Sequence, residues 1–525
     1  MSMVTREPAT VTEHGLLVPL GRFAQQVGVL EALRRVPFAM KTVVHSPSEK
    51  LAELVCHICG GGMHVNDVDS SAHPLIADPA VAAAWGQTAF ASSSGVTALL
   101  RKTTPTTLEA VKKEVRAVLA PYRQRVLRQV TSSWIVVDLD LTGLVVSDQA
   151  TTYEGADYGD MGETGKLGKG DQFARAQWAT DRDRLVLGGF LHPGHTRSTH
   201  GVRELVGLIE ATVGRPRRRV EVLSQRREIL SQQVSALEAP LARWEAQGRR
   251  RRSQAEVAAR RATLRTQIPD LAQRRATCEA DNRTNPAPRR IVLRVEGGFG
   301  TAEHFADLYE QGDRVIARVH SPHIAHCLQH ETDLHWEKIS KNGFIAPSTR
   351  TQLGDCPDPL RLFACKQWWG EEHPERWSAL AATPDLTPTD WPARRVGVFY
   401  NGRQSMEAEI KESKGIFASR HLPTRPQAGI ALDQELVLFA QNGVPLGPRW
   451  FRRQILGNSV LAAAGIKALV QIGARSRAII AHADHGVTLT FVGDGPWRSQ
   501  AIVLCTRFTD QLSLPGFAPF AETQP

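Results

Sequence analysis

The chain has 525 residues, too many for one hydrophobic core, so we expect two to four structural units. A formal net charge of +10 and a pI near 9.4 suit a polyanionic partner, although charge does not separate DNA from RNA or a membrane surface. No apolar run reaches the length of a bilayer span, which argues against a membrane protein. The chain also shows no signal-peptide stretch, and its seven cysteines are an odd number, which argues against a disulfide-rich secreted protein. We therefore expect a reducing, cytoplasmic setting.

The N-terminal quarter, residues 1–125, carries helical patterns separated by segments rich in glycine, histidine and proline. Apolar residues recur with helical spacing over residues 22–33 and again over 107–119. We therefore expect a helical N-terminal domain, although no motif in it identifies a ligand.

The first candidate site follows in the run from Trp134 to Thr142, which is apolar and rich in β-branched residues and ends in acids. These features predict a buried strand, in which Asp138 and Asp140 share one face because side chains two apart point the same way. Two acids at the end of a buried strand are costly unless a cation or hydrogen-bond donors satisfy them. The alternative is a strand-end aspartate that caps a turn.

Residues 215–285 are polar and rich in arginine, and apolar residues recur in two stretches with alternating three- and four-residue spacing. Between the stretches lies a glycine followed by four arginines: Arg249, Arg250, Arg251 and Arg252. This pattern predicts an antiparallel helical hairpin, with kinks expected at Pro240 and Pro269. The arginine tip is a candidate DNA contact; a subunit-pairing role and a solvated charged arm are the alternatives.

A second candidate acid, Glu296, stands between a short apolar run and the turn Gly297–Gly300. A helical pattern follows over 302–311. A carboxylate at a strand end can ligate Mg²⁺. A nucleotide-binding loop is the competing interpretation, but the turn lacks both a complete G-x-G-x-x-G and a P-loop lysine.

Residues 320–394 hold four tryptophans and short strand-like runs, so we expect a mostly β insertion. Most of these tryptophans should be core, and one of them is a candidate for stacking on an extruded DNA base.

The most specific pattern in the chain is formed by Tyr400, Arg403, Glu407 and Lys414. Offsets of three, four and seven residues put all four on one face of a predicted helix. That face carries a carboxylate, two cations and a phenol, whereas a core-facing stripe would be apolar. A carboxylate among cations suits metal-assisted chemistry on phosphodiesters; a solvated, salt-bridged helix face is the alternative.

This spacing resembles the Y-(2)-R-(3)-E-(6)-K signature of DDE insertion-sequence transposases. The runs Asp140-Leu-Thr142 and Arg294-Val-Glu296-Gly-Gly-Phe299 resemble the segments that carry the family's first two acids, with Glu296 where the family has aspartate. The resemblance implies an α/β, RNase H-like mixed-sheet core in three parts, at 126–214, 286–319 and 395–475, followed by a C-terminal segment, 476–525. It also implies that residues 1–125 bind the element's terminal repeats.

The same resemblance implies a catalytic triad of Asp140, Glu296 and Glu407 that holds two Mg²⁺ ions, with Mn²⁺ as a substitute and Asp138 as a neighbouring ligand. Arg403 and Lys414 would bind phosphates, and Tyr400 would hydrogen-bond one. The implied activity is cut-and-paste transposition of double-stranded DNA by a homodimer on the bacterial nucleoid. A DNA-binding relative without activity and an RNase H-like nuclease remain alternatives.

Overall fold

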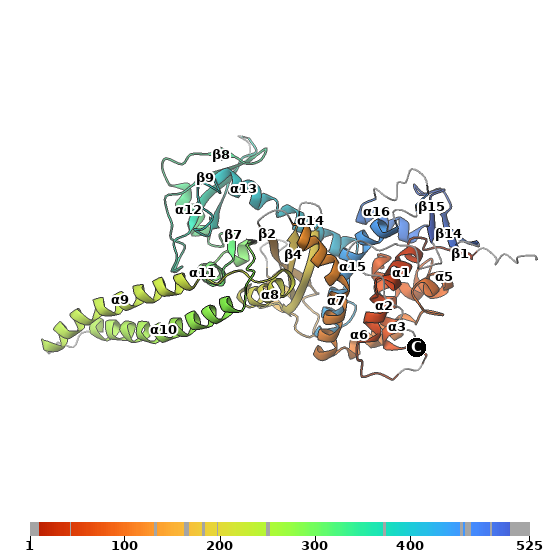
Figure 1. The fold of residues 1–525 in the computed structure, drawn as a ribbon, viewed down its shortest axis with the longest axis horizontal. Helices are drawn as coiled ribbons and strands as arrows, with labels where there is room; N and C mark the ends of the chain where they lie inside the picture. The colour runs from red at the N-terminus through yellow and green to blue at the C-terminus, as the bar shows by residue number, and fades with distance from the viewer. Residues whose placement is uncertain are drawn as a thin grey trace, which may run out of the picture.

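The computed structural model describes residues 10–41, 44–130, 134–161, 167–180, 184–196, 198–247, 252–370, 374–451, 455–456, 464–483 and 486–504. It is an α/β protein with a large mixed sheet at its centre, a helical part on one side and a long helical arm on the other (Figure 1). Among the described residues, every helix is too short or too polar to cross a lipid bilayer.

The N-terminal part consists almost entirely of helices, as the sequence predicts. Its elements are β1 (Thr10–Thr12), α1 (Leu17–Gln26), α2 (Val29–Arg34), α3 (Pro47–Cys59), α4 (Asp67–Ser70), η1 (Leu75–Ala77), α5 (Pro79–Ala84), α6 (Ser93–Lys102) and α7 (Pro105–Gln129). The pattern over 22–33 forms two helices rather than one, because Gly28 adopts a left-handed φ of 82° between α1 and α2.

The central sheet combines antiparallel and parallel pairing. Its strands are β2 (Ile135–Val145), β3 (Asp157–Asp160), β4 (Leu167–Ala179), β5 (Arg184–Pro193), β6 (Ile291–Val295), β7 (Arg314–Arg318), β8 (Glu337–Lys338), β9 (Gly343–Pro347), β10 (Arg361–Gln367) and β11 (Arg376–Ala382). Strand β4 pairs antiparallel with β2, β3 and β5, whereas β2, β6 and β7 run parallel to one another.

The segment expected as a β insertion is continuous with this sheet. Strand β11 pairs antiparallel with β7, and β10, β9 and β8 follow outward. The helix α12 (Pro322–Gln329) packs against β10 and β11. Of its tryptophans, Trp391 is buried, whereas Trp368 and Trp369 are 46% and 43% exposed.

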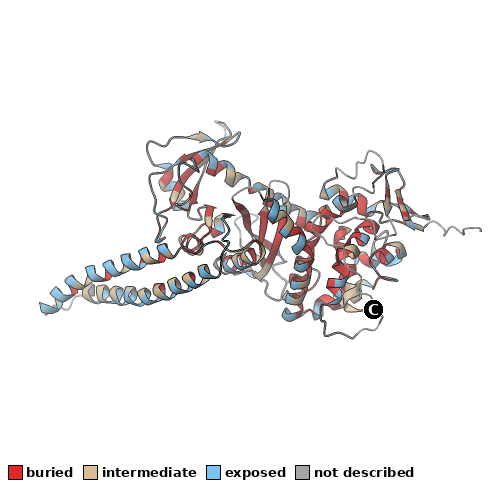
Figure 2. Cartoon of the chain, in the orientation of Figure 1, coloured by how far each residue is buried: buried red, intermediate tan, exposed pale blue. Residues whose placement is uncertain are grey.

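The arginine-rich segment forms an arm of two long helices, α9 (Val220–Ala246) and α10 (Arg252–Arg283), which lie side by side (Figure 1). The arm leaves the body next to α8 (Ser198–Val213) and α11 (Ala302–Gln311), and most of its surface is exposed (Figure 2). Pro240 and Pro269 lie inside helices that continue through them, so neither proline ends its helix.

The remaining elements are η2 (Gly297–Phe299), α13 (Ala393–Asn401), α14 (Gln404–Gly415), α15 (Gln427–Phe451), β12 (Ile455–Leu456), α16 (Ile466–Gln471), η5 (Gly473–Arg475), β13 (Ala478–Ala483), β14 (Gly486–Phe491) and β15 (Ala501–Leu504). A second, antiparallel sheet has the order β1-β13-β14-β15-β12. The boundary we expected at residue 475 falls at the end of η5, whereas this sheet also takes in β12, which pairs with β15, and β1, which pairs with β13.

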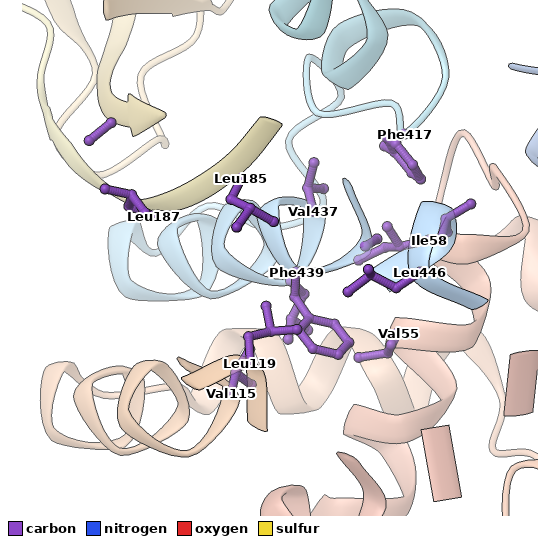
Figure 3. Close-up of a cluster of buried hydrophobic side chains, with 14 of the residues drawn as sticks. Val55, Ile58, Val115, Leu119, Leu185, Leu187, Phe417, Val437, Phe439 and Leu446 are labelled. Carbon is purple, nitrogen blue, oxygen red and sulfur yellow. The ribbon is translucent and has the colours of Figure 1, made fainter. Parts of the chain in front are cut away.

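Helix α15 connects the helical part to the central sheet. Its Val437, Phe439 and Leu446 lie in a buried cluster between side chains of β5 on one side and of α7 and α3 on the other (Figure 3). An ion pair between Arg116 of α7 and Glu435 of α15, at 2.8 Å, adds a polar contact to this interface.

Glu53 gives the helical part a testable pH dependence. Its side chain is fully buried on α3, and one oxygen accepts a hydrogen bond from the Ala91 N–H at 2.8 Å. Burial, with a smaller contribution from Asp69, raises the pKa of Glu53 from 4.5 to about 8, although the hydrogen bond from Ala91 opposes the shift. The unfolded chain loses this proton near pH 4.5 and the folded chain only near pH 8, so the free energy of unfolding falls as pH rises between these values.

We predict that Glu53→Gln removes this fall in the free energy of unfolding, because the glutamine side chain does not titrate. Its Tm should exceed that of the wild type by about 2–4 °C at pH 8, and the difference should shrink toward pH 5. Thermal unfolding at both pH values measures the effect, with Glu228→Gln on the exposed face of α9 as the control. A pH-independent difference would show that Glu53 is ionised in the folded protein.

Candidate active site

Strand β2 presents its two acids to the face of the sheet that lies beneath α14. Val137 and Leu139 point into the large hydrophobic core, so Asp138 and Asp140 project from the opposite face. We expected Asp140 at the end of the strand, but β2 continues beyond it to Val145. It is instead the first residue beyond the parallel ladder to β6, whose last pair is Leu139 and Val295.

Glu296 directly follows β6, as the sequence predicts, and leads into the short helix η2. Its side chain is 47% exposed. Gly300 closes the turn, and a Cβ at that position would overlap the backbone carbonyl of Arg318 on the neighbouring strand β7. Glycine is thus required where the turn approaches β7, and this approach sets the position of Glu296 beside β2.

The run from Tyr400 to Lys414 forms two helices and not the single helix we expected. Helix α13 ends at Asn401 and α14 begins at Gln404, with hydrogen bonds of i to i−3 type between them. The cause is Arg294 of β6, whose Nη1 donates to the Phe399 carbonyl at 2.8 Å and packs on Gly402. This contact ends α13 and starts a second helix over the acids of β2.

The three predicted catalytic acids surround one guanidinium, that of Arg403. Asp140 accepts a hydrogen bond from Nη2, Glu407 lies 3.5 Å from Nη1, and Glu296 lies 3.7 Å from Nη2. Arg403 is 5% exposed. Residues from β2, from the end of β6 and from α14 therefore meet at a single point.

Burial dominates the electrostatics of Asp140. It raises the pKa of Asp140 to about 7, although Arg403 lowers the pKa and Glu296 raises it. The pKa of Arg403 is raised by these carboxylates despite its burial, so the guanidinium stays charged. With all three acids ionised, one guanidinium leaves a formal charge of −2 at this point.

Asp138 has a different environment from Asp140. It is fully buried, and both of its oxygens accept hydrogen bonds from Arg294, at 2.6 and 2.7 Å. A bidentate pair of this kind satisfies the carboxylate. The structure thus places Asp138 in the contact with Arg294 that positions α13, while its role as a neighbouring ligand stays a prediction.

The structure adds a buried cation, Arg175, that sequence reasoning missed. Arg175 lies on β4 directly opposite Asp140 in the antiparallel register, so both side chains share a face. Its Nη1 donates to Ser413 at 3.1 Å, and its Nη2 lies 3.8 Å from Glu409, so it holds α14 against the sheet. The available signal was a charged residue between two alanines, Ala174 and Ala176, in a run that reads as a strand.

Two other predicted DNA-contacting residues are partly buried. Tyr400 donates its hydroxyl to the Val295 carbonyl at 3.2 Å, and burial raises its pKa to about 12. Lys414, half-buried in the last turn of α14, lines a small hollow with Thr142 and Arg175. Arg249, Arg250 and Arg251 lie outside the described residues, and Arg252 is described only as the first residue of α10.

A cleft of about 650 Å³ opens beside the acids. It is lined by Glu296, Arg403 and Glu407 and by residues on and near β7, β9, β10 and β11. Among the latter are the cations Arg318, Lys366 and Arg376 and the ring of Trp377. The cleft lining therefore combines carboxylates with cations, which suits a ligand that carries both phosphates and a bound metal ion.

Comparison with known proteins adds no identification: no family model and no curated protein matches the chain.

The structural role of Asp138 can be distinguished from the role of the exposed acid Glu407 by their effects on stability. We predict that Asp138→Asn lowers the free energy of unfolding by about 3–5 kcal/mol, because it leaves Arg294 buried without its partner. Glu407→Gln, at a side chain that is 55% exposed, should change it by less than about 0.5 kcal/mol. Denaturant unfolding measures both. Unchanged stability in Asp138→Asn would count against its structural role and favour the ligand role.

Proposed function

We propose that this protein is a DDE-type DNA transposase that cleaves the ends of a DNA element and joins them to target DNA. The observation that carries the proposal is the meeting of Asp140, Glu296 and Glu407 around Arg403. These residues are separated by 156 and 111 positions in the sequence, and the spacing motif by itself does not require them to meet.

The central sheet supports an RNase H-like core. Its strands include the order β5-β4-β2-β6-β7, in which the β5-β4-β2 pairs are antiparallel and the β2-β6-β7 pairs are parallel. The acids come from the central strand, from the end of its parallel neighbour and from a helix on one face. A mixed sheet whose acids come from two neighbouring strands and one helix supports such a core.

The donor set fits Mg²⁺, because all three side chains offer carboxylate oxygens and the cluster keeps a formal negative charge after pairing with Arg403. Asp140, Glu296 and Glu407 would hold two Mg²⁺ ions, or Mn²⁺, which would lower the pKa of an attacking water and stabilise the leaving oxygen. Among the described residues, no group of three or more acidic, histidine or cysteine side chains has the spacing of a metal site in the present arrangement. The guanidinium and the metal ions thus compete for the same oxygens.

The cleft would take the phosphodiester backbone of double-stranded DNA. Arg318 and Arg376, which line the cleft, would contact phosphates along the backbone, and Arg403 would contact the scissile phosphate beside the acids. Tyr400 would act chiefly through its bond to β6, and Lys414 would contact DNA beyond the end of α14. Such a protein would work on the nucleoid as a homodimer, with one site for each element end.

The chemistry requires two displacements at phosphorus. In the first, a water oxygen forms a bond to phosphorus and the 3′ oxygen of the element leaves as a hydroxyl. In the second, that hydroxyl attacks a target phosphodiester, and the target's own 3′ oxygen leaves. Neither step needs an oxidant, a reductant or a covalent enzyme intermediate.

The decisive experiment incubates the purified protein with Mg²⁺ and with duplexes taken from the DNA on either side of its gene. We expect cuts at the element ends and joined products with a target plasmid. Cleavage without joining would identify an RNase H-like nuclease. Binding without cleavage would identify a DNA-binding relative, the alternative that glutamate at position 296 favours.

Glu296 provides a test of the second acid. We predict that Glu296→Ala reduces Mg²⁺-dependent cleavage at least 1000-fold, on the order of a lost catalytic group, while Glu296→Asp keeps part of the activity because it keeps a carboxylate. A gel assay of strand cleavage measures both variants. Wild-type activity in Glu296→Ala would remove this residue from the triad.

The competition at Arg403 can be measured without activity. We predict that Arg403→Gln binds Mg²⁺ at least about tenfold more tightly than the wild type, because a cation within 4 Å of all three acids is removed, and that it cleaves poorly. Isothermal titration with Mg²⁺ gives the affinity. Lys414→Gln, which removes a cation at the far end of α14, is the matched control. Equal affinities in all three proteins would show that the acids hold no metal.

A further inference from the structure

The arm is fixed to the body by buried arginines at its base. Arg226 of α9 is 8% exposed and donates to Glu310 of α11 at 3.0 Å, to the Ala306 carbonyl at 3.0 Å and to both oxygens of Asp358. Arg274 of α10 donates to the same Glu310. Both helices of the arm are therefore anchored on one buried carboxylate.

Two further arginines extend this anchor just before α9. Arg218 pairs with Glu210 of α8 and with Asp281 of α10, and it donates to the Gln311 carbonyl at 3.0 Å. Arg219 pairs with Asp385 at 2.6 Å, beyond the end of β11. The anchor thus joins the arm to α8, to α11 and to the β-rich segment, and the charges of its own four arginines, Arg218, Arg219, Arg226 and Arg274, are paired with carboxylates.

The distal half of the arm has a different charge balance. Its described residues, 238–247 and 252–265, contain five arginines and three glutamates, a formal charge of +2. Arg265 of α10 pairs with Glu238 of α9, which fixes the antiparallel register. Five residues further toward the tip on each helix, Arg243 and Arg260 lie at one level, and both are exposed.

From these observations we propose that the distal half of the arm is a double-stranded DNA-binding surface, held by the basal anchor at a fixed distance from the cleft. A helix rises about 1.5 Å per residue, so Arg243 lies about 25 Å beyond Arg226, the length of seven to eight base pairs. The identity of the polyanion as DNA rests on the proposed function. The surface itself rests on the charges and the anchor.

The charge also argues against a second copy as the occupant. Two arms of this composition repel each other, and their apolar seam is already used within the hairpin, where Leu223, Val234, Leu241 and Leu271 are buried. A phosphate backbone offers regularly spaced negative charges along a length comparable with that of the arm.

The first experiment removes three distal charges, with Arg243, Arg260 and Arg261 changed to alanine. The control removes three exposed arginines near the base, Arg217, Arg227 and Arg283. Affinity for a mixed-sequence duplex is measured across a salt series. The distal variant should flatten the slope of log K against log salt by up to about 2.7, because fewer counterions are released, whereas the control should keep the wild-type slope. Equal slopes in the two variants would overturn the proposal.

The second experiment tests the fixed distance with a deletion of one heptad from each helix. Residues 231–237 and 266–272 lie at the same level in the register set by Glu238 and Arg265, so their removal shortens the arm by about 10 Å without changing its pairing. Affinity is measured against duplexes of increasing length. Wild-type affinity should rise once the duplex reaches from cleft to arm, and the deletion should lower that length by about three base pairs.

An unchanged length threshold, or no rise at all in the wild type, would rule out a distal contact at fixed distance. Both experiments measure binding alone. If the protein does not cleave DNA but the distal arginines change the salt slope, the transposase proposal fails and the DNA-binding arm is supported. If the protein cleaves and joins DNA but the distal arginines have no effect, the transposase proposal is supported and the DNA-binding arm fails.

Discussion

The arrangement of this protein depends on how it compensates buried negative charge beneath α14. Asp140 is buried and close to Glu296 and Glu407, and like charges so near one another are unfavourable in a low-dielectric site. Arg403 offsets this repulsion from the centre of the three. The position of α14, and with it Glu407, is coupled to β2 through this guanidinium.

Two more arginines surround this centre and hold the backbone in place. Arg294 binds Asp138 and the end of α13, and Arg175 binds Ser413 and Glu409 on α14. Each is buried, and removing either would leave an uncompensated carboxylate or a loosened helix. The candidate active site is therefore a layer of cation–carboxylate pairs between the sheet and two short helices.

The same kind of contact joins the outer parts to the site. Arg226 and Arg219 connect the arm to carboxylates in the β-rich segment, and β11 continues the sheet from β7. The strands that line the cleft and the base of the arm are thus parts of one continuous framework. A ligand that contacts the arm and the cleft together would meet surfaces whose separation is set by buried ion pairs.

The sequence determined the elements whose pattern is local. The strand that contains Asp138 and Asp140, the strand and glycine turn at Glu296, helix α11 and the two long helices of the arm all follow from periodicity and turn residues within short windows. The spacing of Arg403 and Glu407 likewise placed them one helical turn apart, and the structure pairs them across that turn.

Tertiary structure decided what depends on partners distant in sequence. Local spacing favoured one helix through Tyr400 and Lys414, but Arg294, more than a hundred residues earlier, ends the first helix at Asn401. Asp138 and Asp140 are equivalent by alternation, and only the positions of Arg294 and Arg403 give them different environments. Neither segment's sequence predicts the pairing of β1 with β13, because the packing of the whole chain determines which strand a given strand pairs with.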